Sequence, residues 1–203
     1  MVDVKNMVFD KNLIFEESGH VYRLNGLIVP SVTTIMRPLS EKVYGGVNKQ
    51  SMMAAAERGT AVHNAIEIYN EYSVGDISDE YKGYLDAYID WKSKNNVKVF
   101  RSEVKMYHKS DLYAGTADLL CEIDGKIFLV DYKTVSLIDE RHEKMYGVQL
   151  EAYAQALKSH GLAVEGKCVL HIKKDGTWRE YKYPARDLAS LEMFRACWRI
   201  YNF

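Results

Sequence analysis

Apolar and polar residues alternate with a period that changes several times along the chain, and this pattern predicts an α/β fold. Residues 13–29 have the period of short strands, broken by turns at Ser18-Gly19 and Asn25-Gly26, and Asn-Gly is a strong hairpin signal. Five later stretches have the same period: 97–108, 112–123, 126–135, 165–173 and 178–183. Four stretches have the period of helices: 51–72, 79–95, 139–160 and 187–203. This order predicts a central mixed β-sheet flanked by helices, with an N-terminal β-hairpin arm.

Length and composition favour one domain overall. The chain has 203 residues, of which 47% are hydrophobic and 27% charged, enough to bury one substantial core. We expect residues 1–50 to form the arm and a loop with glycines at Gly45-Gly46, and residues 51–203 to form the core. No run approaches the roughly 18 apolar residues of a membrane span, and the first residues do not resemble a signal peptide. A cytoplasmic protein that does not enter a membrane is therefore expected.

Charge and cysteine content exclude some classes of function. The formal net charge of -1 argues against a protein whose whole surface binds nucleic acid. Two local stretches are basic, 92–109 and 167–182, and each suits either a phosphate backbone or an ordinary solvated face. The three cysteines are widely spaced without a CxxC pair, which suggests neither disulfides nor a zinc or iron–sulfur site.

Carboxylates are expected to meet on one face of the central sheet. A two-residue turn at Asp124-Gly125 would pair Ile123 with Lys126. The same register places Asp118 opposite Asp131, and Lys133 follows on the same face. Such a pair of acids requires a cation or a raised pKa.

The preceding hairpin adds a further acid to this face. If it closes symmetrically around His108-Lys109-Ser110-Asp111, Glu103 lies opposite Thr116 on the face that carries Asp118. An exposed, solvated sheet face would be the alternative, but the flanking runs are apolar on both faces, as in strands covered on both sides. Hard oxygen ligands in this setting indicate Mg²⁺ or Mn²⁺.

Four motifs in order resemble the PD-(D/E)xK nuclease superfamily. The core motif is Gly115-Thr-Ala-Asp118 followed, after twelve residues, by Asp131-Tyr-Lys133. The segment Arg58-Gly59-Thr60-Ala-Val-His63 resembles the GxxxH motif of the RecB-like branch, and Gln149-Leu-Glu-Ala-Tyr153 resembles its QxxxY motif. The opening segment 20–36, HVYRLNGLIVPSVTTIM, is similar to phage and prophage members of that branch. Members with an iron–sulfur cluster carry four cysteines, so that cofactor is not implied.

The resemblance implies a restriction-endonuclease-like core and a role for each matching residue. The implied metal ligands are His63, Asp118, Asp131 and the backbone carbonyl of Tyr132, and Glu103 would be an additional acid. The implied catalytic residues are Asp118, Asp131, Lys133, Gln149 and Tyr153, with the lysine serving the attacking water. Arg58, Ser31 and Thr33 would contact phosphates, although capping and surface solvation explain them equally well. Gly59 would allow a close approach of the helix to the sheet or to the substrate.

The function implied by this resemblance is a divalent-metal-dependent DNA exonuclease of phage-type recombination or DNA processing, using Mg²⁺ or Mn²⁺. A structure-specific or site-specific endonuclease of the same fold is the alternative within this chemistry. A non-catalytic nucleic-acid-binding module is the alternative from another class. DNA is the implied partner, with a phage single-strand annealing protein and a second copy of the chain as further candidates. The expected setting is the cytoplasm of a bacterial or phage-infected cell.

Overall fold

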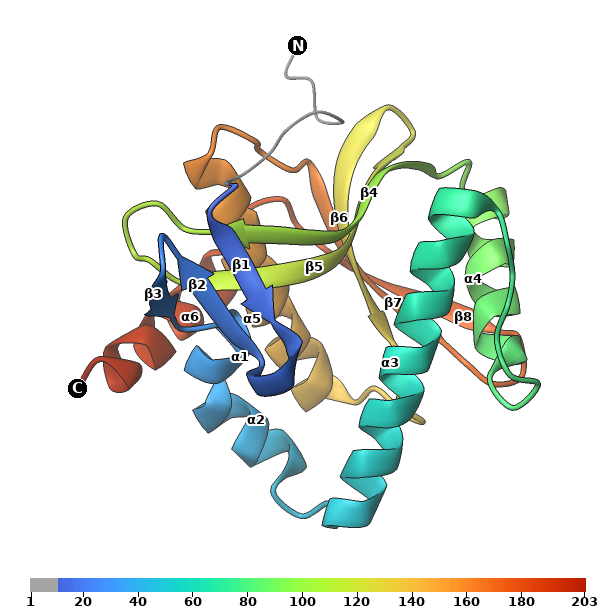
Figure 1. Cartoon of the computed structure of the whole chain (residues 1–203), viewed down its shortest axis with the longest axis horizontal. Helices are drawn as coiled ribbons and strands as arrows, with labels where there is room; N and C mark the ends of the chain where they lie inside the picture. Colours follow the sequence, from blue (N-terminus) through green and yellow to red (C-terminus); the bar gives the residue numbers. More distant parts are fainter. Residues whose placement is uncertain (1–10) are drawn as a thin grey trace.

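The computed structural model describes residues 11–203, which form two β-sheets and their surrounding helices (Figure 1). Residues 1–10 lie outside the described residues. The prediction that the first residues are not a signal peptide falls mostly on them. The strands are β1 Leu13–Glu16, β2 Val21–Leu24, β3 Leu27–Val29, β4 Lys98–Tyr107, β5 Ala114–Ile123, β6 Lys126–Lys133, β7 Gly166–Ile172 and β8 Trp178–Tyr183. The helices are α1 Val32–Ile35, α2 Arg37–Tyr44, α3 Lys49–Tyr72, α4 Lys82–Lys94, α5 Glu140–Ser159 and α6 Leu188–Tyr201, and a short 3₁₀ turn, η2, covers Glu17–Gly19.

The predicted mixed central sheet is confirmed. Its strand order is β4-β5-β6-β7-β8, with β6 and β7 parallel and the other neighbours antiparallel. Parallel strands need a long crossover, and α5 supplies it between β6 and β7. The crossover carries α5 across the face of the sheet on which Asp131 lies.

Helices cover both faces of this sheet, as the apolar runs of β5 and β6 require. On one face α3 and α4 pack through side chains such as Ile66 and Trp91. On the other face α1, α5 and α6 pack through side chains such as Leu150 and Phe194. The result is a three-layer α/β/α arrangement, with α3 and α4 side by side in Figure 1.

The arm predicted as a β-hairpin is a three-stranded antiparallel sheet, β1-β2-β3. It is attached to the central sheet at β5, where the Ala114 N–H donates to the carbonyl of Pro30 at 2.9 Å. A second link joins the Tyr22 hydroxyl to the Thr116 hydroxyl at 2.8 Å. The arm is therefore fixed to the strand that carries Asp118.

The loop expected up to residue 50 is wrong, because α1 and α2 occupy most of that segment. Ser31 caps α1 by accepting a hydrogen bond from the Thr34 N–H at 3.0 Å, and Pro38 lies at the start of α2, where proline is tolerated. The glycine pair follows the end of α2. Helices this short give too few turns for a periodic signal.

None of the helices in the described part of the chain is long and apolar enough to cross a membrane.

Candidate active site

The central sheet forks at the two aspartates of the core motif. The predicted β5–β6 register is confirmed from Ile123↔Lys126 to Leu119↔Val130, where the ladder ends. Beyond it β5 stays paired with β4, and β6 stays paired with β7. The Asp118 carboxylate occupies the fork and accepts a hydrogen bond from the Tyr132 N–H at 2.6 Å. Asp118 is held in place by the strand that would otherwise have paired beside it.

Glu103 lies at the same point of the neighbouring strand, although its predicted partner is wrong. Lys105, and not Glu103, pairs with Thr116, so the register of β4 places Glu103 beside Asp118. The displacement is two residues, and since side chains alternate with a period of two, the expected face is unchanged. Glu103 has a positive φ of 48°, a strained conformation for a strand residue.

The closing loop explains the displaced register. The His108 N–H donates to the carbonyl of Tyr113 at 2.8 Å, so the loop lies between these residues and not one position earlier. Leu112 adopts a left-handed φ of 56°, and the Asp111 N–H donates to His108 Nδ1 at 3.1 Å. The sequence pattern indicated a turn here but placed it one position too early, because the turn carries no glycine that would mark its exact position.

Helix α3 brings a nitrogen donor to the two acids. His63 Nδ1 lies 3.4 Å from Asp118 Oδ1 and 4.0 Å from Glu103 Oε1. One donor atom from each of His63, Glu103 and Asp118 lies within 4.8 Å of the others. An imidazole nitrogen with carboxylate oxygens is a donor set that suits Mn²⁺ and Mg²⁺.

The carboxylates of this cluster favour a positive charge on the groups beside them, and one of the acids is stabilised in its ionised form. Burial lowers the pKa of His63, but the charge of Asp118 and its hydrogen bond outweigh burial and raise the pKa to about 9. Burial raises the pKa of Asp118, yet His63, Lys133 and the Tyr132 N–H bring it below its ordinary value. Asp118 is thus the acid best prepared to stay ionised.

The other two acids hold their protons more tightly. Burial, and then the charge of Asp118, raise the pKa of Glu103 to about 7. Burial raises the pKa of Asp131 to about 6 against the opposing effect of Lys133. In addition, Asp131 Oδ2 is buried without a well-aligned hydrogen bond, although Lys133 Nζ lies 2.5 Å away. A divalent cation would relieve this repulsion, so the cluster fits such an ion.

Lys133 lies at the centre of the polar contacts around the site. Besides Asp131, its ammonium group donates to Gln149 Oε1 at 3.4 Å and lies 4.7 Å from the centre of the Tyr146 ring. Burial lowers the pKa of Lys133, but Asp131 and Asp118 raise it above its ordinary value. The lysine is therefore positively charged and restrained from three sides.

Helix α5 positions Gln149 and Tyr153 toward this lysine. The helix begins at a capping box in which the Asp139 carboxylate accepts from the His142 N–H at 3.0 Å. Gln149 Nε2 donates to the Tyr153 hydroxyl at 3.0 Å, and the Tyr153 ring packs against the backbone of Gly115. The predicted shared face of this helix is confirmed.

The structure separates the expected phosphate contacts. Ser31 and Thr33 line the same cleft as the aspartates. Ser31 also caps α1, which agrees with the alternative that this serine is a helix cap. Arg58 is not among the residues that line the cleft, and its Nε donates to Oγ1 of Thr134, the residue after Lys133, at 3.4 Å. Close approach of Gly59 to the sheet is wrong, because a Cβ there would meet no protein atom within 4 Å.

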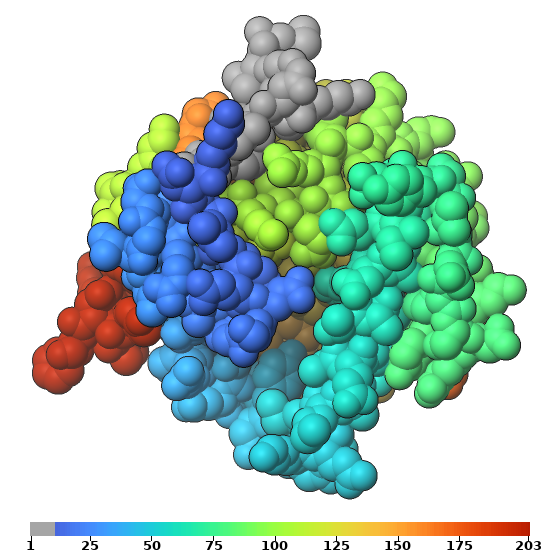
Figure 2. All heavy atoms as spheres, viewed as in Figure 1, coloured from blue at the N-terminus to red at the C-terminus, as the bar shows by residue number. Residues whose placement is uncertain are grey.

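The site lies in an open cleft between the arm and α3 (Figure 2). Phe15, His20 and Tyr22 of the arm line one wall, and Asn64 and Glu67 of α3 line the other. A substrate can therefore reach the aspartates from solvent.

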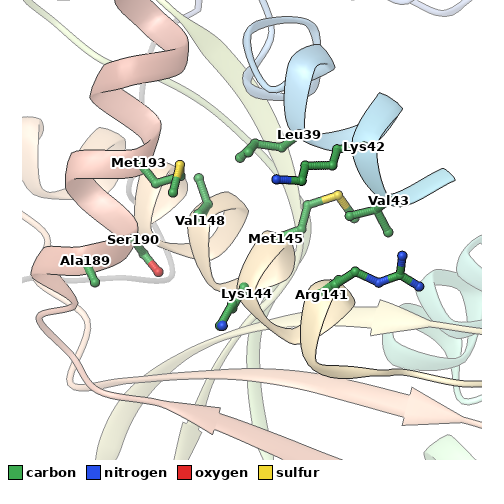
Figure 3. Close-up of a pocket in the computed structure, with 10 residues that line it drawn as sticks. All are labelled: Leu39, Lys42, Val43, Arg141, Lys144, Met145, Val148, Ala189, Ser190 and Met193. Atoms are coloured by element: carbon green, nitrogen blue, oxygen red, sulfur yellow. The ribbon is translucent and has the colours of Figure 1, made fainter. Parts of the chain in front are cut away.

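A second hollow lies between α2, α5 and α6 (Figure 3). Its walls combine apolar side chains such as Met145 and Met193 with the cations Lys42, Arg141 and Lys144. Its described lining holds no carboxylate, so it lacks the chemistry of the cleft.

Two tyrosines of the site were not anticipated. Tyr146 faces Lys133, and its hydroxyl is 2.8 Å from that of Tyr44 on α2. Tyr146 lies three residues before Gln149, so its helical spacing was a usable signal. Tyr44 was not predictable because α2 was not.

The chain is similar to one protein family and, more distantly, to solved structures. Residues 89–196 match the family described as the PD-(D/E)XK nuclease superfamily. No curated protein matches the chain. Among solved structures, "SSO0001" is 15% identical with a TM-score of 0.43, over 98% of this chain and 81% of that chain.

Two further structures are of one enzyme. LHK-Exo in complex with dAMP is 11% identical with a TM-score of 0.42, over 84% of both chains. The alkaline exonuclease LHK-Exo from Laribacter hongkongensis, in a second structure, is 8% identical with a TM-score of 0.36, over 68% of this chain and 74% of that chain.

Proposed function

The chain belongs to the PD-(D/E)XK nuclease superfamily, with the predicted restriction-endonuclease-like α/β fold, and we propose that it is a divalent-metal-dependent DNA exonuclease. The observation that carries the proposal is the meeting of His63, Glu103 and Asp118 within 4.8 Å, beside the Asp131–Lys133 pair. Four separate elements contribute these side chains to one open cleft.

The metal would be Mg²⁺ or Mn²⁺, held by His63, Asp118 and Asp131, with Glu103 and the Tyr132 carbonyl as further oxygen donors. Such an ion supplies a bound water of lowered pKa and offsets the negative charge that develops on a phosphate. No described residue offers a thiolate here, since Cys121, Cys168 and Cys197 are buried elsewhere. The donor chemistry therefore favours hard cations.

The role proposed for Lys133 is to orient the attacking water and to stabilise charge on the phosphate. Its raised pKa keeps the ammonium group charged at neutral pH, which suits charge stabilisation better than proton abstraction. Gln149 and Tyr153 would hold the lysine and contact the phosphate, because they form a hydrogen-bonded chain that ends at Lys133.

Exonuclease action and a phage-type role rest on the motifs of the RecB-like branch. Gly59 and His63 lie on the helix beside the acids, and Gln149 and Tyr153 lie on the helix beside the lysine. We also propose that arm and core act as one domain, because Tyr22 joins the arm to β5. A single-strand annealing protein or a second copy of the chain would be further partners.

End-labelled linear DNA, single-stranded and duplex, tests the activity when it is incubated with Mg²⁺, Mn²⁺ or EDTA. We expect mononucleotides from one end, no cleavage in EDTA, and no degradation of covalently closed circles. Lys133→Ala should abolish cleavage while Mn²⁺ binding is kept, and Asp118→Asn should lose both.

Each proposal has an outcome that contradicts it. Discrete internal fragments or cleavage of closed circles would favour an endonuclease. Tight binding of DNA that is independent of metal, with no cleavage of any substrate, would favour a binding module.

A further inference from the structure

Three aromatic rings of the arm form one wall of the catalytic cleft. Phe15 and Tyr22 are direct cross-strand partners on β1 and β2, with ring centres 4.6 Å apart. His20, which directly follows η2, lies edge-on to both, 5.1 Å from Phe15 and 6.1 Å from Tyr22. All three line the cleft that holds Asp118 and Asp131. The proposed hydrolysis of a phosphodiester makes no use of these rings.

The rings differ in how much of them a ligand can reach. Tyr22 is 3% exposed and is fixed by its hydrogen bond to Thr116. Phe15 is half-buried, and His20 is exposed at the tip of a turn, where it adopts a left-handed φ of 50°. Tyr22 is therefore the buried support of the cluster. Phe15 and His20 are the side chains that a ligand can touch.

The cluster lies close to the reacting centre. Thr116 is two residues before Asp118 on β5, about 7 Å along the strand and on the same face. Tyr22 touches Thr116, and Phe15 and His20 pack on Tyr22. A nucleotide next to the one that is cleaved would thus reach the rings.

The charges of the cleft set which part of the nucleic acid meets which wall. Lys105 Nζ lies 5.9 Å from the centre of the Phe15 ring, and Lys133 lies deeper in the same cleft. Glu17 and Glu67 also line the cleft, on the arm and on α3. A phosphate bound by Lys105 would lie next to the Phe15 ring, so the base attached to that phosphate would be within reach of the aromatic wall of the arm.

We propose that Phe15 and His20 form a stacking platform for an unpaired base, so that the substrate is single-stranded DNA or a frayed end. In a duplex the faces of a base are covered by its neighbours in the stack, whereas an unpaired base offers its face to an aromatic side chain. The inference rests on the proposed nuclease function and narrows its substrate class.

A purely structural cluster would behave differently. The arm has its own apolar core, built around Tyr22, Leu24 and Val29, to which Phe15 adds only a part of its surface. A packing role would make substitutions lower the melting temperature and affect all substrates alike. A stacking role makes them act on unpaired bases.

The test compares Phe15→Leu, which keeps an apolar side chain, and His20→Ala with the wild type. Ile28→Ala is the matched control, because Ile28 is on the same small sheet and 64% exposed, and is not among the cleft-lining residues. KM and kcat are measured in Mn²⁺ on one sequence as a single strand and as a blunt duplex. We expect KM for the single strand to rise about tenfold in the combined variant, with the duplex unaffected.

Fluorescence of 2-aminopurine gives a second readout, since stacking quenches this base. The probe is placed at each of the first four positions from either end of a single strand, in the absence of metal. We expect quenching at one position with the wild type and with Ile28→Ala, and its loss in the Phe15→Leu, His20→Ala variant.

An unchanged ratio of single-strand to duplex KM, with unchanged quenching, would overturn the platform and leave the nuclease intact. A fall in melting temperature with equal losses on both substrates would assign the cluster to packing. If the wild type cleaves no DNA, the nuclease proposal fails, and the quenching and its loss in the variant still decide whether the platform exists.

Discussion

Replacing Gly115 by alanine would push a methyl group into the ring of Tyr153. The added Cβ would lie 2.5 Å from Tyr153 Cε1 and 3.2 Å from Cδ1, whereas carbon atoms in contact are normally about 3.5–4.0 Å apart. The ring must therefore move by about 1 Å. Tyr153 is 3% exposed, so such overpacking costs about 1–3 kcal/mol of folding free energy.

The displacement would reach the lysine through the contacts of α5. Moving the ring weakens the 3.0 Å hydrogen bond from Gln149 to Tyr153, and Gln149 then loses the geometry of its contact with Lys133. A misplacement of about 1 Å at a reacting group lowers a rate by roughly a hundredfold. We expect kcat in Mn²⁺ to fall about 10- to 100-fold, while the affinity for Mn²⁺ stays within about twofold because the metal donors do not move.

Single-turnover cleavage, Mn²⁺ titration and thermal melting separate these effects. Gly46→Ala is the control, since a Cβ at Gly46 meets no atom within 4 Å. Tyr153→Phe removes only the hydroxyl and should lower the rate without the loss of stability from overpacking. Wild-type rates in both Gly115→Ala and Tyr153→Phe would show that this tyrosine does not position the lysine.

Three other substitutions test separate parts of the site. Lys105→Glu should weaken DNA binding for all sequences and reduce its salt dependence. Lys98→Glu is the control and should leave DNA binding unchanged, because Lys98 is paired with an acid outside the cleft. Titrations of DNA binding at rising salt concentration measure both effects. Glu103→Gln should stabilise the protein in EDTA at pH 8 by about 1–3 kcal/mol. Because burial raises the pKa of Glu103 from its ordinary value of 4.5 to about 7 in the folded state, the wild type loses stability relative to the variant as pH rises from 4.5 to about 7, and the difference levels off above that. Melting temperatures from pH 5 to 8 would reveal this loss, and equal slopes in both proteins would refute it. Gly59→Ala should raise stability by about 1 kcal/mol, as no atom obstructs the methyl group, and a lower melting temperature would contradict this.

Local turn chemistry accounts for what was predictable in the site. Asp124-Gly125 forms a two-residue turn, and because that turn has one preferred geometry, it fixed the pairing up to Leu119 and Val130. The predicted pairing of Asp118 with Asp131 is wrong, because the ladder stops one pair before it, although both residues lie directly beyond its end. The fork itself did not follow, because it depends on where the hydrogen bonds stop.

Features that depend on tertiary packing were not predictable. The loop before β5 closes through a left-handed Leu112, a residue type that gives no turn signal. Helices α1 and α2 are stabilised by burial of side chains such as Ile35 against α5, which a short segment does not show in its own pattern. Tyr44, which contacts Tyr146 from α2, could not be placed in the site for the same reason, whereas Tyr146 itself shares a helix face with Gln149.

The fork explains why this fold can keep several acids together at one point. A continuous ladder would hold Asp118 and Asp131 as a fixed cross-strand pair of like charges, which destabilises a sheet. Opening the ladder instead gives Asp118 the Tyr132 N–H as a hydrogen-bond donor and lets His63 approach from α3. The strands remain stable because apolar clusters cover both faces just beyond the fork. The repulsion that remains, visible in the raised pKa of Glu103 and Asp131, is what a divalent cation would relieve, so metal affinity and instability without metal have the same physical origin.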